Sequence, residues 1–244
     1  MDYAFLKNRA RSVAHNDILK RWADPSENFS FNDYSIIMNN LRHWLAPTVK
    51  RLEAGLEILK ETGNDYALDE IIHAFEHNIE DEKGDGKESS HAYLFNKSTQ
   101  TYSNAVYSKE IKFCKGLPTT MLLKKSSEDF FKGDLFVMLG AALAQEIHAL
   151  PQLELLLKGL EKNKSDFSES EWDNVEYFYE IHLDGTEARH AEDLNQTIWE
   201  LIDDENKNTR FLEGFDGILS HLDKFWNGIT EEVKFNENTS LCAD

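Results

Sequence analysis

Apolar residues recur at helical spacing along most of the chain. Between residues 31 and 60 they return every three or four positions, which predicts one long helix. The same periodicity predicts helices over 66–81, over 90–96, from about 119, over 172–202 and over 211–233. The polar stretch 97–104 lacks the pattern and is predicted to be a loop, and 126–134 is only weakly patterned.

The segment 135–150 is apolar on almost every side of a helix, so it is predicted to be a central, buried helix. Pro151 should kink this helix rather than end it, because leucines continue the pattern up to Leu160. Further on, Ser168 and Glu171 have the spacing of a capping box, which marks the start of the long helix that follows.

The composition supports an all-α fold. The 244 residues include only 4 Pro and 12 Gly, and alternating runs typical of strands are nearly absent. No repeat or shift in composition marks a boundary, so we expect residues 1–244 to form a single all-α domain of six to eight helices. About 25 N-terminal and about 10 C-terminal residues are expected to be peripheral to it.

The charge excludes two classes of partner. A formal net charge of −19 disfavours nucleic acid and anionic membrane surfaces, both of which require a basic surface. No apolar run approaches the roughly 18 residues of a membrane span, and no secretory signal is visible at the N-terminus. We therefore expect a cytoplasmic protein.

Two stretches carry candidate metal ligands ahead of the C-terminal third. Glu70 and His77 are seven residues apart, so on a helix their side chains overlap. Glu146 lies in the most apolar helix, where an unpaired carboxylate would cost several kcal/mol or take up a proton. A buried acid of this kind usually has a basic partner or a bound metal.

A third group comprises His182, Glu187 and His190. Glu187 and His190 have the i, i+3 spacing found in carboxylate-bridged di-iron proteins. His182 precedes His190 by eight residues, so a π-bulge, eased by Gly185, would bring it onto the same face. Carboxylates and imidazoles together suit iron or manganese, and the three groups jointly predict a two-metal site.

These motifs resemble the haem-oxygenase-like di-metal oxidases, which include CADD-like proteins and UndA-type fatty-acid decarboxylases and share their fold with TenA and PqqC. The resemblance rests on HNIEDEKGDGKESSHAYLF, LGAALAQEIHALPQLELLLKGL and YFYEIHLDGTEARHAEDL, and it covers roughly residues 30–230. CADD-like proteins are the most similar group. The resemblance implies a haem-oxygenase-like, TenA-like bundle of about seven helices around a central site.

The resemblance also implies the ligand set and the cofactor. The family's ligand positions match Glu70, His77, Glu146, His182 and His190. The sixth position departs from the pattern, because Thr186 stands where the family has Asp. Glu187 is the natural substitute, with Asp184 as the other candidate, and the second of two irons is expected to bind weakly. Manganese is the alternative metal.

The function implied is a non-haem di-iron oxidase or oxygenase, an oxidoreductase that activates dioxygen on a small, apolar organic substrate. No catalytic residue is expected beyond the metal ligands, and a homodimer is compatible with the fold. The substrate itself cannot be read from these residues.

Other readings stay open at this stage. A ferritin-like di-metal protein would take its ligands from two Glu-x-x-His pairs, Glu70 with His73 and Glu187 with His190, and from Glu146 with Glu53 or Glu57. In that case His77 and His182 would not be ligands. A metal-free CADD-like protein would bind a small molecule without catalysis. A haem-handling protein would draw a proximal ligand from His15 or His43, which leaves Glu146 unexplained.

Overall fold

The computed structural model describes residues 2–62, 66–84, 86 and 89–241, without the side chains of 66–67, 186–190, 193 and 235–241. Every regular element in that part of the chain is helical, as predicted. The elements are α1 (Tyr3–Ala14), α2 (Asp17–Ala23), α3 (Phe31–Leu45), α4 (Thr48–Thr62), α5 (Tyr66–Lys83), α6 (His91–Tyr107), α7 (Pro118–Phe130), α8 (Leu135–Glu161), the 3₁₀ turn η1 (Lys164–Asp166), α9 (Glu169–Leu183), α10 (Thr186–Leu201) and α11 (Glu205–Leu241).

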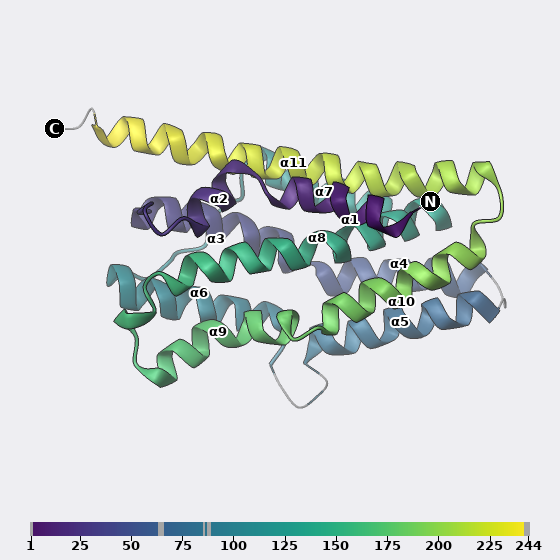
Figure 1. Cartoon of the computed structure of the whole chain (residues 1–244), viewed down its shortest axis with the longest axis horizontal. Coiled ribbons are helices and arrows are strands. Elements are labelled where there is room, and N and C mark those ends of the chain that lie inside the picture. The colour runs from purple at the N-terminus through teal and green to yellow at the C-terminus, as the bar shows by residue number, and fades with distance from the viewer. Residues whose placement is uncertain (1, 63–65, 85, 87–88, 242–244) are drawn as a thin grey trace.

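These helices form an elongated bundle in which α8 runs through the middle and α11 lies along one side (Figure 1). The helix α8 packs against α11, α1, α2, α10, α9 and α4, so it is the central helix that its apolar sequence predicted. It continues through Pro151, as expected, and Asp134 caps its first turn by accepting hydrogen bonds from the N–H groups of Phe136 and Val137.

The described part of the bundle has more helices than the roughly seven expected, because two predicted helices are each divided and the N-terminal segment forms α1 and α2. The predicted helix over 31–60 breaks at Ala46 and Pro47 into α3 and α4. The predicted helix over 172–202 breaks at Gly185, whose φ of 102° lies in the left-handed region that favours glycine. The capping box of Ser168 and Glu171 is present, but it starts α9 at Glu169.

The predicted loop over 97–104 is wrong, since these residues belong to α6. Their polar side chains hide the helical pattern, yet Ser98 and Ser103 are buried. Each hydroxyl donates a hydrogen bond to a backbone carbonyl, Ser98 to Val175 and Ser103 to Lys109. Satisfied in this way, a serine can occupy the packed face of a helix.

The N-terminal segment differs from its expected peripheral place. Residues of α1 and α2 are fully or almost fully buried, among them Leu6, Ala10, Ile18 and Trp22. The indole N–H of Trp22 donates a hydrogen bond of 2.9 Å to the carbonyl of Leu156 on α8. These two short helices therefore close one side of the core.

The two longest helices, α8 and α11, approach each other backbone to backbone. A Cβ atom at Gly140 on α8 would overlap the carbonyl of Phe211, and one at Gly214 on α11 would overlap the carbonyl of Val137. Only glycine leaves room for such a crossing. Among the residues described above, no helix is both long enough and apolar enough to cross a bilayer.

Candidate metal centre

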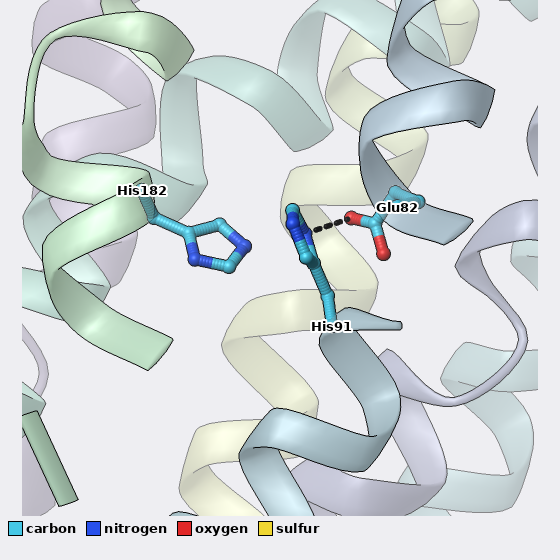
Figure 2. Close-up of side chains that lie close together, drawn as sticks. All are labelled: Glu82, His91 and His182. Carbon is cyan, nitrogen blue, oxygen red and sulfur yellow. Dashed lines mark ion pairs between the residues drawn. The ribbon is translucent and has the colours of Figure 1, made fainter. Parts of the chain in front are cut away.

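Three side chains that can hold a metal ion meet between α5, α6 and α9. They are Glu82 in the last turn of α5, His91 at the start of α6 and His182 near the end of α9, and one ligand atom from each lies within 4.8 Å of the others. Figure 2 shows the ring of His91 between the other two side chains. The ring centroids of His91 and His182 are 4.5 Å apart.

The surroundings of His182 prepare it to bind a metal. Its Nδ1 lies 2.5 Å from the carbonyl oxygen of Phe178, so the ring proton belongs on Nδ1 and the lone pair on Nε2. Burial, and then the neighbouring His91, lower the pKa of His182 to about 4. The ring is therefore neutral at pH 7, which is the form that coordinates metals.

His91 leaves hydrogen-bonding capacity unused beside Glu82. The Nδ1 atom of His91 is buried and has no hydrogen-bond partner. Oxygen Oε1 of Glu82 lies 3.6 Å from it, which is too long for a hydrogen bond. A cation between the two groups would satisfy both, so the residues fit a divalent metal ion.

Glu146 lies beside this group. Its side chain is buried in α8 and lines the same cavity as Glu82 and His182. The amide of Asn78 on α5 donates a hydrogen bond of 3.1 Å to Glu146 Oε1. Asn78 thus holds this carboxylate oxygen in place in the cavity, and the ligand role of Glu146 stays a prediction.

The cavity shared by these residues is small, and several polar side chains contribute to its wall. Its volume is about 50 Å³, and its polar lining includes Arg51, Gln145, His148 and Gln152 besides the carboxylates. Trp44 and Phe178 contribute aromatic walls. This space is smaller and more polar than the apolar substrate cavity expected from the abundance of aromatic residues.

The structure does not bring Glu70 and His77 to this centre. Glu70 is exposed, and the side chain of His77 is 62% exposed with its Nδ1 3.2 Å from Asp81. The buried face of α5 carries Ile71, Phe75 and Ile79. His77 lies two residues from Phe75 and from Ile79, about 200° around the helix, so it points away from the core. Glu70 and His77 therefore lie away from this centre, and their ligand roles stay predictions.

The exposure of α5 also weakens the ferritin-like alternative. That reading requires His73 as a ligand, and the side chain of His73 is 83% exposed. The same helix instead presents Asn78 and Glu82 to the cavity.

The side chains of Thr186, Glu187 and His190 lie outside the described residues. Their backbone belongs to α10, which begins immediately after Gly185. The π-bulge expected between His182 and His190 is replaced by this break between α9 and α10, and Asp184 at the break is exposed. The roles of Glu187 and His190 as ligands stay predictions.

Two buried histidines should make the metal-free protein sensitive to acid. Burial lowers the pKa of His148 to about 3, and that of His182 lies near 4 as described above. Both are below the unfolded value of about 6.5, so stability is fully present above pH 6.5 and declines as the pH falls toward 4. Between pH 7 and pH 5 we expect each histidine to reduce the free energy of unfolding by about 2 kcal/mol.

Urea denaturation at both pH values, with a chelator present, measures this loss. The variant His148→Gln should lose about half of the acid sensitivity, because it removes one of the two groups. His73→Gln, at an exposed position, is the matched control and should keep it. If the free energy of unfolding of His148→Gln depended on pH as strongly as that of the wild-type protein, His148 would take up its proton in the folded state as readily as in the unfolded state.

The comparison with known proteins gives a family and a fold. Residues 36–232 match the family model of a domain of unknown function with solved structure, DUF3865, so the chain belongs to that family. No curated protein is detectably similar to the chain.

Solved structures with the same fold cover almost the whole chain. A CADD-like protein of unknown function from Nostoc punctiforme PCC 73102 is 17% identical, with a TM-score of 0.72 over 94% of this chain and 97% of its own. A TenA homologue from Pseudomonas syringae pv. tomato DC3000 is 13% identical, with a TM-score of 0.73 over 93% and 92%. A domain of unknown function with a haem-oxygenase-like fold from Shewanella denitrificans OS217 is 16% identical, with a TM-score of 0.70 over 97% and 95%. The chain therefore has the haem-oxygenase-like fold, as the resemblance implied.

Proposed function

We propose that this protein is a metal-dependent oxidoreductase that holds non-haem iron at Glu82, His91, Glu146 and His182 and activates dioxygen on a small organic substrate. The observation that carries the proposal is the convergence of Glu82, His91 and His182 within 4.8 Å inside a helical bundle. Two carboxylates and two imidazoles suit iron, with manganese as the alternative. Ferrous iron bound there would supply electrons for the reduction of dioxygen.

The residues around the centre have separate tasks in this proposal. The Phe178 carbonyl fixes the tautomer of His182, and Asn78 orients Glu146. Trp44 and Phe178 form aromatic walls of the cavity and would limit the access of water to a bound metal. The polar lining beside the ligands would position the substrate, and no further side chain is required as an acid or base.

A second iron belongs to the same proposal as a weaker site. Glu187 and His190 would supply its ligands from α10, as predicted from their i, i+3 spacing. The family's Asp is replaced by Thr186, so this site should fill only at higher iron concentration.

Anaerobic loading with ferrous iron tests the proposal. We expect about one tightly held iron per chain by elemental analysis, and a transient optical absorption with oxygen consumption when air is admitted. Iron that is retained but does not consume oxygen would exclude the oxidase. A protein that retains neither iron nor manganese would leave only a metal-free function, such as binding a small molecule.

A further inference from the structure

Arg51 on α4 is a buried cation in the wall of the metal cavity. It is 1% exposed. Its Nε donates to Gln145 Oε1 at 3.2 Å, Nη1 to the Trp44 carbonyl at 3.0 Å and Nη2 to Thr48 Oγ1 at 3.0 Å. A guanidinium carries more N–H donors than these contacts use, so Arg51 can still donate to a further acceptor.

Arg51 has no direct ionic partner in the described part of the chain, where no carboxylate oxygen lies within 4.0 Å of it. Burial lowers its pKa to about 10, against the opposing effect of Glu82, Glu128 and Glu146, so it stays charged at neutral pH. A divalent ion at the proposed centre would offset the charges of Glu82 and Glu146. The charge of Arg51 would then lack a counter-ion, and leaving it buried would be costly.

Two further polar groups in the same cavity also lack partners. They are His148 Nε2 and Gln152 Oε1, one turn apart on α8, and both residues are 2% exposed. A buried polar atom without a hydrogen bond destabilises the fold. A neutral imidazole can donate from Nε2, and a flip of the Gln152 amide presents an N–H₂ group in place of the oxygen. Both side chains can therefore donate to one acceptor.

We infer that this cavity binds a carboxylate group, with Arg51 as its counter-charge and His148 and Gln152 as hydrogen-bond donors. The inference names the substrate class of the proposed function and rests on the metal centre of that function. A volume of about 50 Å³ admits a carboxylate group but not a large molecule. The carboxylate is thus either a small free acid or the end of a longer organic acid whose remainder extends out of the cavity.

Calorimetric titration of the Zn²⁺-loaded protein tests the site without oxygen chemistry, because Zn²⁺ accepts the same ligands and is redox-inert. We expect acetate to bind the wild-type protein. Arg51→Met should bind it about 10- to 100-fold more weakly, the value of a charged hydrogen bond of 1.5–3 kcal/mol. Arg42→Met is the matched control, since Arg42 bonds Asn96 and stacks on Phe113 away from the cavity, and it should bind acetate normally.

A second variant keeps the test valid if Arg51→Met does not fold. Gln152→Leu should weaken acetate binding several-fold and raise the melting temperature of the ligand-free protein, because it removes an unsatisfied buried amide. A comparison of octanoate with acetate distinguishes a longer organic acid from a small free acid as the source of the carboxylate. Tighter binding of octanoate identifies the end group of a longer acid, and tighter binding of acetate identifies a small free acid.

The outcomes distinguish this inference from the proposed function. If Zn²⁺ is retained and neither acid binds, or if both bind equally well to Arg51→Met, the carboxylate site is wrong while the metal centre stands. If the wild-type protein does not retain Zn²⁺, the metal centre fails and the same titration is run on the metal-free protein. Binding that depends on Arg51 would then preserve the carboxylate site, and no binding would overturn it.

Discussion

Replacing His91 by asparagine should weaken metal binding by more than about 100-fold, whereas His77→Asn should leave it unchanged. Loss of a group that merely orients a ligand costs about 10- to 100-fold in affinity, and loss of the ligand itself should cost more. His91 has a buried Nδ1 without a hydrogen-bond partner beside Glu82 and His182. His77 is mainly exposed on the outer face of α5. Competition with a chromogenic chelator measures both affinities.

A second pair of variants applies the same test to the carboxylates of one helix. Glu82→Gln should weaken metal binding by a similar factor, and Glu70→Gln should not, because Glu82 lines the cavity and Glu70 is exposed. Circular dichroism of all four variants checks that the bundle is intact. A larger loss of metal affinity in the variants of Glu70 and His77 would support the ligand roles predicted for these two residues and contradict the centre at Glu82, His91 and His182.

Part of this centre can be read from the sequence. Glu146 is predicted as a ligand because a carboxylate is conspicuous in an apolar helix, and His182 because it lies in a stretch rich in histidine and acid. Both predictions compare the polarity of a residue with that of its neighbours in the sequence, so neither requires knowledge of the fold. The two side chains do lie at one cavity.

Glu82 is not among the predicted ligands, although the sequence contains a signal for it. On a helix, Ile71, Phe75, Asn78 and Glu82 fall within about 60° of arc, so the polar pair continues the apolar face. Spacing between Glu70 and His77 shows only that they share a face, and the apolar residues decide which face is buried. Among the acidic residues of α5, Glu82 is the one that shares this face with Ile71 and Phe75.

His91 could not be found in this way, because its position depends on the chain between α5 and α6. Periodicity gives no register across a loop, so the distance between Glu82 and His91 in space is unknown from the sequence. The division of the two long helices at Pro47 and Gly185 is a similar case. Single residues signal a break there, but tertiary packing determines whether a helix bends, kinks or ends.

The contact between α8 and α11 is another feature that only the fold reveals, and it leads to the prediction with the largest effect on stability. Gly140→Ala should lower the free energy of unfolding by about 3 kcal/mol or more, at the upper end of the range for overpacked cores. In an isolated helix the same change would stabilise by up to about 1 kcal/mol. The sign reverses here because the new methyl group would overlap the carbonyl of Phe211, which the backbone of α11 holds in place.

Gly214→Ala should have an effect of similar size, because its methyl group would meet the carbonyl of Val137 from the other side of the same crossing. Ser220→Ala, at an exposed position of α11, is the control and should change stability by less than about 0.5 kcal/mol. Urea denaturation and thermal melts measure all three, and the glycine variants should melt about 10 °C lower. Since α8 also carries Glu146, helices forced apart at Gly140 should loosen the metal centre as well. Glycine variants that are as stable as the wild-type protein would show that α8 and α11 do not meet backbone to backbone.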